Sequence, residues 1–369
     1  MENAPIVIDI GTSHTFAGYG GESEPDVSIS SILGRRITSS TKVISPLSST
    51  DFMIGSNVYK NSDKYTPCLP IDNRVITNFD DFTAFINTLI TVHLNTIPKT
   101  HPLLLTVSPY ESAKSKETIL QIMMETFKVP ALLPASSSQL VLHAADINSG
   151  IVVDAGETGT SIMPIFESYS IPYYSGRLDV GGRQITDQLR NSLTQRGYSL
   201  KTGTEREILR DMKSKICYIS LDPVASAQDA PQQSFTTPDG ADIKLTSQCF
   251  MCPEILFKPG LCGCEQEGTS HQIAEVISKV DDDIRNQLAT NIVLAGGSTM
   301  FPGYADRIIH DLSELLPEQS VNVVANQDRI ESAWIGGSIL ASVGTFNKLY
   351  ISQEEYDEYG ASIIPLKMY

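Results

Sequence analysis

Two short stretches of this sequence carry the same pattern of residues that could hold phosphate and a metal ion. "PIVIDIG", Pro5 to Gly11, and "GIVVDAG", Gly150 to Gly156, are apolar runs that end in Asp, one further residue and Gly. Glycine permits a tight turn, and the hydroxyls and free amides of the following "TSHT" and "ETGT" are groups that cradle phosphate oxygens. Facing one another across a cleft, Asp9 and Asp154 could hold a hydrated Mg²⁺.

One Asp-x-Gly alone often only closes a hairpin. Two copies, at the starts of two halves of the chain, are harder to explain in that way. Two Gly-Gly joints follow, in Arg177 to Ser199 and in Asn291 to Gly303. Each places free helix N–H groups where an anion or nucleotide could bind, although a single Gly-Gly is more commonly just a turn. The two Asp-x-Gly stretches and the two Gly-Gly joints together predict a nucleotide or anion site.

The elements that must position these residues alternate along the chain. The two apolar runs before Asp9 and Asp154 are rich in β-branched residues, as in strands buried on both faces of a sheet. Amphipathic patterns predict helices, which lie between β-branched runs such as "HPLLLTVSP" and "VNVVAN", at Glu111 to Phe127, Gly182 to Arg196 and His271 to Ala289. This alternation predicts an α/β protein of two duplicated halves with a cleft between them.

Size and charge narrow the function further. A chain of 369 residues exceeds what one core usually serves, which predicts two domains. Lys and Arg number 27 against 43 Asp and Glu, and the net charge of -16 argues against direct nucleic-acid binding. No apolar run approaches the roughly 20 residues that span a bilayer, so no membrane insertion is expected. Together with six dispersed cysteines, this favours an intracellular protein.

Four longer stretches are much more specific than any glycine motif. They are Glu205 to Asp222, Asn291 to Gly303, Ser332 to Phe346 and Ile351 to Ile363. Through them the sequence resembles the actin family over essentially its whole length. The resemblance implies the actin-like ATPase fold, in which two duplicated α/β domains flank a nucleotide cleft. It also implies ATP or ADP with Mg²⁺ (or Ca²⁺) as ligands, and usually self-assembly into filaments.

The resemblance also implies domain limits. Residues 1–144 and 332–369 would form an outer domain, with residues 33–69 as a small inserted subdomain. Residues 145–331 would form an inner domain, with residues 181–263 as its small subdomain. The chain would cross between the domains near Leu140 and near Trp334, and these crossings would act as a hinge.

Several family contacts carry over to matching positions. The implied nucleotide-binding residues are Asp9, Gly11, Thr12, Ser13, Asp154, Gly156, Thr160, Gly182, Arg210, Lys213, Gly296, Gly297, Met300 and Phe301. Asp9 and Asp154 would hold the metal through water. Three positions depart from the family pattern. Phe16 replaces a phosphate-binding lysine, which removes a charge-assisted hydrogen bond of roughly 1.5–3 kcal/mol. Ser214 replaces a ribose-contacting glutamate, and Ile330 replaces a lysine beside the adenine.

The catalytic positions depart as well. The family orients the attacking water with a glutamine and a histidine, which here are Ser137 and Ser161. Gln139 is close in sequence, but residues two apart on a helix or strand point in different directions. Phosphoryl transfer depends on positioning the nucleophile, so the remaining set of Ser137, Asp154 and Ser161 is degenerate. We therefore expect a nucleotide-binding protein that hydrolyses ATP very slowly or not at all.

Polymer and partner contacts give a mixed expectation. The insert from Arg35 to Gly55 lies where actins grip a neighbouring subunit, but it is rich in Ser and Thr. The plug segment keeps Leu261 and is otherwise less apolar than usual, which reduces the expected filament affinity. Ile339 to Ser352, with Tyr169, retains the apolar residues of the family's cleft for actin-binding proteins. The expected partners are therefore itself, other actin-like subunits and actin-binding proteins, at a cytoplasmic, cytoskeletal location.

Several alternatives remain open at this stage. A fully active polymerising actin ATPase is one, a nuclear actin-related subunit of a chromatin complex is another, and a small-molecule kinase on the same superfamily fold is a third. Independently of the family, Cys249, Cys252, Cys262 and Cys264 give C-x2-C and C-x-C pairs that could surround Zn²⁺. Because C-x-C is an uncommon zinc spacing and Cys is frequently a plain core residue, we expect no zinc there.

Overall fold

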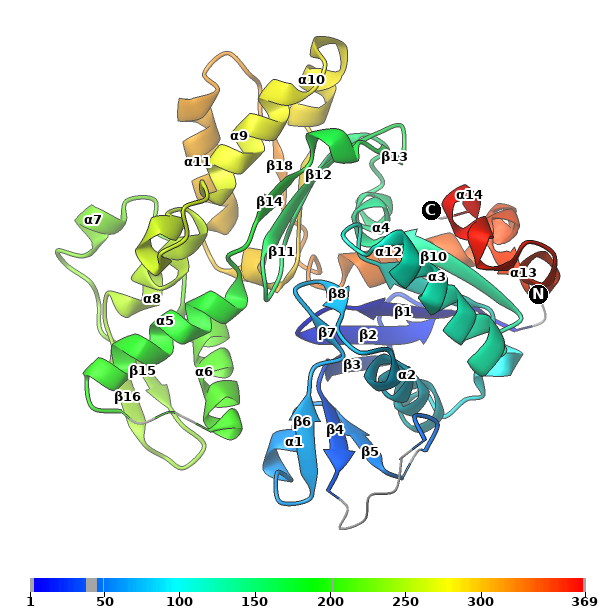
Figure 1. The fold of residues 1–369 in the computed structure, drawn as a ribbon. Helices are drawn as coiled ribbons and strands as arrows, with labels where there is room; N and C mark the ends of the chain where they lie inside the picture. Colours follow the sequence, from blue (N-terminus) through cyan, green and yellow to red (C-terminus); the bar gives the residue numbers. More distant parts are fainter. Residues whose placement is uncertain (1–2, 38–44, 49, 199, 201, 368–369) are drawn as a thin grey trace. The chain divides into compact units, whose positions relative to one another are not determined.

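The computed structural model describes residues 3–37, 45–48, 50–198, 200 and 202–367, and divides into two compact units. The first unit consists of Met1–Ile147 and Glu331–Tyr369, and the second of Asn148–Ile330. Each unit is built around its own mixed sheet with helices packed on it (Figure 1). The predicted α/β class is therefore confirmed, and each unit is described by itself below.

The main sheet of the first unit has the strand order β19-β10-β9-β1-β2-β3. Its strands are β1 (Ile6–Ile10), β2 (His14–Tyr19), β3 (Val27–Ser30), β9 (Leu103–Val107), β10 (Ala131–Ser136) and β19 (Ile351–Ser352). Strands β1, β9 and β10 run parallel, whereas β1 and β2 form an antiparallel hairpin. The carboxyl ends of the parallel strands therefore meet at one edge, next to the hairpin turn.

Both faces of this sheet are buried, as the apolar runs predict. Ile6 and Ile8 of β1 belong to one apolar cluster, and Val7 between them belongs to another. This alternation follows from the two-residue period of a strand. Helices α2 (Phe79–Thr88) and α3 (Ala113–Gln121) contribute to the first cluster, and α4 (Ser137–Ala144) and α12 (Ser332–Ser342) to the second.

Helices α4 and α12 pack with their backbones in contact. A Cβ atom added at Gly336 would lie 1.8 Å from the carbonyl oxygen of Leu140. Only glycine permits this approach. Trp334 of α12 is fully buried, and its indole N–H donates to the carbonyl of Val7 at 3.1 Å. The first unit thus joins its two chain segments through α4, α12 and β1.

The remaining elements of the first unit are short. They are β4 (Leu33–Arg36), β5 (Phe52–Ile54) and β6 (Tyr65–Cys68), which form a small sheet, α1 (Asn57–Lys60), the hairpin β7 (Ile71–Asp72) and β8 (Val75–Ile76), α13 (Gln353–Tyr359) and α14 (Ile364–Lys367). The insert expected at 33–69 includes residues 38–44 and 49, which lie outside the described residues.

The second unit repeats the arrangement of the first. Its main sheet has the order β13-β12-β11-β17-β18, with β14 paired to β12. The strands are β11 (Gly150–Ala155), β12 (Thr160–Phe166), β13 (Tyr169–Ser170), β14 (Gly176–Leu178), β17 (Ile292–Ala295) and β18 (Val323–Val324), and β15 (Gln233–Thr236) pairs with β16 (Asp242–Leu245). As in the first unit, an antiparallel hairpin (β11–β12) is followed by a later parallel strand (β17) beside its first strand. The two halves therefore share one topology.

Residues at the ends of the helices of the second unit explain where several of these helices begin. They are α5 (Gly182–Gln195), α6 (Gly203–Ile216), α7 (Pro223–Ser226), α8 (Gln248–Met251), α9 (Thr269–Lys279), α10 (Asp282–Ala289) and α11 (Tyr304–Leu315). A capping box starts α6, in which Thr202 accepts from the N–H of Glu205 and the Glu205 carboxylate accepts from that of Thr202. The single helix predicted at His271 to Ala289 is wrong. Buried Val280 is extended and Asp281 takes the N-cap position, which divides the segment into α9 and α10.

Candidate functional site

The turn of the first hairpin, residues 11–13, offers one unused buried donor. The N–H of Gly11 donates to the carbonyl of His14 at 2.9 Å, which closes the turn. The hydroxyl of Thr12 is buried and has no hydrogen-bond partner among the residues that the structure describes. By contrast, the Ser13 hydroxyl lies 3.1 Å from the ring Nδ1 of His14. A buried hydroxyl without a partner is costly, which makes Thr12 a candidate ligand-binding residue at this turn.

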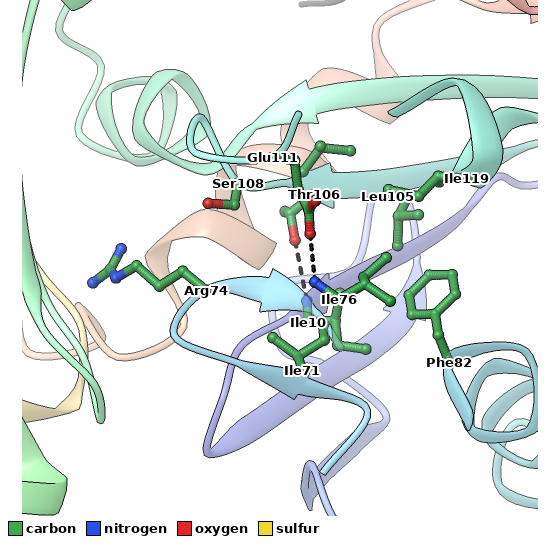
Figure 2. Close-up of a pocket in the computed structure, with 11 residues that line it drawn as sticks. Ile10, Ile71, Arg74, Ile76, Phe82, Leu105, Thr106, Ser108, Glu111 and Ile119 are labelled. Carbon is green, nitrogen blue, oxygen red and sulfur yellow. Dashed lines mark hydrogen bonds between the residues drawn. The ribbon is translucent and has the colours of Figure 1, made fainter. Parts of the chain in front are cut away.

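The carboxylate of Asp9 is positioned by the neighbouring strand. The hydroxyl of Thr106 in β9 donates to Asp9 Oδ1 at 2.8 Å and accepts from the N–H of Ile10 at 3.1 Å, the second of which is dashed in Figure 2. Thr106 therefore connects the two parallel strands at their carboxyl ends. Sequence reasoning missed this residue, which lies in the "HPLLLTVSP" run that was interpreted only as a strand.

Phe16, at the family's lysine position, faces the core. It lies opposite Asp9 in the β1–β2 register, is 4 % exposed, and packs in the cluster that contains Val7, Leu104 and Trp334. No cation reaches the first turn from this strand position. Phe16 is therefore a core residue in this structure, and the loss of a phosphate contact at this position stays a prediction.

The second unit brings its three glycine-containing joints together. The carbonyl of Gly156, in the β11–β12 turn, accepts from the N–H of Gly182 at 3.0 Å and from the hydroxyl of Ser298 at 2.9 Å. Gly182 is the first residue of α5, and Ser298 lies in the turn after β17. Three of the four glycine-containing motifs of the sequence therefore meet in this unit, around the carbonyl oxygen of Gly156.

The β11–β12 turn also holds unused hydroxyls. Gly156 N–H donates to the carbonyl of Gly159 at 2.9 Å, as Gly11 does to His14 in the first hairpin. The hydroxyls of Thr158 and Thr160 are buried and lack hydrogen-bond partners within the described part of the chain. Equivalent turns in the two units therefore each carry a buried threonine hydroxyl that no other described residue binds.

A buried ion cluster stands beside this turn. Glu157 Oε1 lies 2.6 Å from Nη2 of Arg210, and its Oε2 lies 3.7 Å from Nζ of Lys213. Lys213 also donates to the carbonyl of Gly182 at 2.8 Å. The Glu157 side chain is 6 % exposed. Burial alone would raise the pKa of Glu157, but the charges of Lys213 and Arg210 outweigh it and hold that pKa below its usual value.

Arg210 and Lys213, which the resemblance places near the nucleotide, also contact a carboxylate of this protein. Both cations are already neutralised in part by Glu157, a residue that sequence reasoning did not assign. Its signal was present, since it follows Gly156 directly in the quoted "ETGT". Burial lowers the pKa of Lys213, and the Glu157 carboxylate opposes that shift. Among these three side chains, the single carboxylate of Glu157 therefore offsets part of the charge of the two cations.

The segment after β17 approaches Asp154 closely through a glycine and exposes apolar side chains. Gly296 has φ +84°, and a Cβ there would lie 2.4 Å from Asp154 Oδ1, so only glycine fits beside that carboxylate. Met300 and Ile330 are each 37 % exposed, whereas Phe301 is buried. Ile330 Cδ1 lies 3.7 Å from the Cβ position of Gly297. Partly exposed apolar side chains next to glycine can accept a flat aromatic base.

The three serine positions are found in different settings. Ser137 is the first residue of α4, and Gln139 lies two residues further along that helix, about 200° around its axis. Ser161 is 1 % exposed in β12, opposite Asp154 in the register. Ser214 donates its hydroxyl to the carbonyl of Asp211 at 2.9 Å, within its own helix. Ser214 is therefore turned to the helix backbone rather than offering a carboxylate-like acceptor.

The cysteines of the C-x2-C and C-x-C pairs all lie in the second unit. All six cysteines are free thiols. Among the described residues, no three His, Cys, Asp or Glu side chains are grouped so that they could hold a metal ion. Burial raises the pKa of Cys252 to about 12 and also raises that of Cys249, as expected of core thiols.

Some of the apolar residues named for partner contacts are exposed, whereas Leu340, Tyr350 and Ile351 of the expected partner segment are buried. Tyr169 of β13 is 77 % exposed and Leu261 is 51 % exposed in the second unit, and Ile339 of α12 is 45 % exposed in the first. The side chains at 345–347, within the expected partner segment, lie outside the described residues. None of the described helices is long and apolar enough to cross a membrane.

The geometry of both units is therefore that of a duplicated α/β fold with paired hairpin turns. A comparison with known families agrees with the resemblance in the sequence. The family model described as Actin matches residues 1–369, the whole chain. The chain belongs to the actin family.

Proposed function

We propose that this chain binds ATP or ADP with Mg²⁺ (or Ca²⁺), hydrolyses ATP very slowly or not at all, and acts as an actin-like filament subunit or a filament-associated protein. The observation that carries the proposal is the pair of buried threonine hydroxyls, Thr12 and Thr158, at equivalent turns of the two units. Members of the actin family generally bind a nucleotide and a divalent cation.

The residues present fit a polyphosphate. Leaving a hydroxyl buried and unpaired costs about 1–3 kcal/mol, which a phosphate oxygen accepting from Thr12 or Thr158 would recover. Backbone amides of tight turns add fixed partial charges of the sign that phosphate requires. Asp9, held by Thr106, and Asp154, beside Gly296, would hold the metal through water. When bound, the metal would neutralise phosphate charge.

The second unit would hold the nucleoside. Met300 and Ile330 supply an apolar wall for the base, and neither donates a hydrogen bond. Because Glu157 already engages Arg210 and Lys213, these cations add little net attraction for phosphate. Affinity would therefore depend on the turns and the metal, and should be weaker than that of family members with the lysine at position 16.

Slow or absent hydrolysis follows from the two serines. A serine hydroxyl extends only one atom beyond Cβ, whereas glutamine and histidine reach further and can hold a water at a distance from the backbone. Ser161 is also almost fully buried in β12, which leaves it little freedom to reorient. Without an oriented water, the positional part of catalysis is lost.

The filament role rests on exposed apolar residues. Tyr169, Leu261 and Ile339 expose large apolar surface, and such residues anchor protein interfaces. The chain's charge of -16 opposes close packing of identical subunits, so assembly should strengthen as salt rises from a low concentration. Sedimentation of the protein with Mg-ATP over a salt series tests this, and no pelleting at any salt concentration, alone or with actin, would contradict it.

Titration calorimetry of nucleotide-free protein tests the nucleotide site. Mg-ATP should bind, and Thr158→Val, which replaces the hydroxyl with a methyl group of similar size, should weaken binding by about tenfold. The same variant should not lose stability, because its hydroxyl has no partner to lose. Thr88→Val is the matched control, since that buried hydroxyl donates to the carbonyl of Ala84 at 2.8 Å. It should lose stability and keep its ATP affinity.

A further inference from the structure

The turn between β7 and β8 holds two non-glycine residues in the left-handed backbone region. φ is +48° at Asn73 and +66° at Arg74. Asp72 pairs with Val75 across the hairpin, so these two residues form the whole turn. Turns of this kind favour Asn followed by Gly, because a side chain at the second position is strained. A strained arginine where glycine would fit more easily points to a function of its side chain.

The hairpin is anchored to the body of the first unit. Oε1 of Glu111 accepts from the N–H of Ile76 at 2.6 Å, as Figure 2 shows, and Glu111 is buried. On the other side of the turn, the N–H of Asn73 donates to Asp72 Oδ1 at 2.9 Å. The backbone from which Arg74 extends is therefore fixed, and a fixed guanidinium loses less freedom when it binds an anion.

Arg74 lies at the same edge of the main sheet as the first turn. It lines a small cavity together with Ile10 and Thr106, at the carboxyl ends of β1 and β9. Ile10 is followed directly by Gly11, and Thr106 is the residue that holds Asp9. Arg74 is the only basic residue among the described residues that line this cavity. In sheets with parallel strands, ligands bind beyond these carboxyl ends.

The cavity itself is not the ligand site. Its volume of about 30 Å³ is far too small for a nucleotide, and its lining combines apolar side chains with polar ones. Figure 2 shows the Arg74 side chain extending from the turn away from the apolar wall that Phe82 and Ile119 form. The charged end of Arg74 therefore lies on the side of the turn opposite that apolar wall.

We propose that Arg74 supplies the phosphate-binding cation that this chain lacks at Phe16. The proposal rests on the proposed function and names the group that recognises the nucleotide's phosphates in the first unit. Phe16 is committed to the core, whereas Arg74 extends from a fixed turn at the edge where the Thr12 hydroxyl is unused. A guanidinium has five donors, so it can keep a protein acceptor and still bind phosphate oxygens.

The test compares two glycine substitutions in the same turn. Arg74→Gly removes the cation and relieves its strained backbone, whereas Asn73→Gly relieves strain and keeps the cation. Both variants should melt at or above the temperature of the unaltered protein. Calorimetry should show ATP affinity falling by about tenfold or more in Arg74→Gly and unchanged in Asn73→Gly. Adenosine, which has no phosphate, should bind all three proteins equally.

Different failures have different meanings. If the unaltered protein binds no Mg-ATP, both the proposed function and the role of Arg74 are overturned. If it binds ATP and Arg74→Gly binds ATP equally well, only the role of Arg74 is overturned. Equal losses for ATP and adenosine would assign Arg74 a structural role instead. Arg74-dependent binding of inorganic phosphate with unchanged ATP affinity would place a separate anion at Arg74 and likewise overturn the proposal.

Discussion

Replacing Glu157 with glutamine should destabilise the second unit by about 3 kcal/mol at neutral pH. Its carboxylate is 6 % exposed and lies 2.6 Å from Arg210 and 3.7 Å from Lys213. Removing one member of a buried ion pair leaves a buried charge without compensation, which costs about 3–5 kcal/mol. We use the lower end of this range because both cations keep another partner. Glu207 Oε1 also contacts Arg210, at 2.8 Å, and Lys213 still donates a hydrogen bond to the carbonyl of Gly182.

The pH dependence of this effect has a definite sign. The folded-state pKa of Glu157 lies below its usual value, so the carboxylate's contribution to stability is fully present above the unfolded-state pKa. It is lost as pH falls through the lowered folded-state pKa. The stability difference between the unaltered protein and Glu157→Gln should therefore be constant from pH 6 to 7 and should shrink steadily in the acid range.

Urea unfolding followed by circular dichroism measures this difference. Glu207→Gln is the matched control, because Glu207 contacts the same arginine and is more exposed, and it should cost less than about 1 kcal/mol. Trp334 is the only tryptophan and lies in the first unit, so its fluorescence should report a smaller shift than circular dichroism does. A Glu157→Gln variant as stable as the unaltered protein at neutral pH would show that the Glu157 carboxylate does not stabilise the second unit.

Three further predictions follow from packing and burial. Gly336→Ala would place Cβ 1.8 Å from the carbonyl oxygen of Leu140 and should lower the melting temperature sharply, whereas Gly344→Ala, which meets no atom within 4 Å, should not; equal melting temperatures would contradict this. Phe16→Lys should clearly lower stability, since it buries an ammonium among apolar side chains. A variant that reached the ATP affinity expected of a family lysine and kept its stability would contradict this. Cys252, with its pKa raised to about 12, should resist iodoacetamide at pH 8 until urea unfolds the protein, and mass spectrometry showing rapid native labelling would disagree.

Much of the fold could be predicted because its signals are local. The buried runs around Asp9 and Asp154 became the first strands of two equivalent hairpins, since β-branched apolar residues without polar interruptions suit a sheet covered on both faces. The helix predicted from Gly182 to Arg196 begins at the same residue as α5 and ends one residue after it. The break at Val280 was missed, because an apolar residue at a helix end fits the same periodicity as one inside a helix.

The candidate site was less accessible to sequence reasoning because its contacts are long-range. Thr106 holds Asp9 from a strand far along the chain, which no local pattern reveals. Glu157 and Arg210 also meet only in the folded chain. Arg74 was missed for a different reason. Its left-handed backbone conformation suggests a function, but an Asn-Arg dipeptide does not predict that conformation as Asn-Gly would.

The fate of bound ATP tests directly whether this chain hydrolyses it very slowly or not at all. Purified nucleotide-free protein is loaded with Mg-ATP, freed of excess nucleotide, and sampled over hours, and the bound nucleotide is separated into ATP and ADP by chromatography. We predict that bound ATP stays intact far longer than it does on ordinary actin, because on our proposal Ser137 and Ser161 do not orient the attacking water. Conversion to ADP at ordinary actin's rate, or protein that retains no nucleotide, would contradict it.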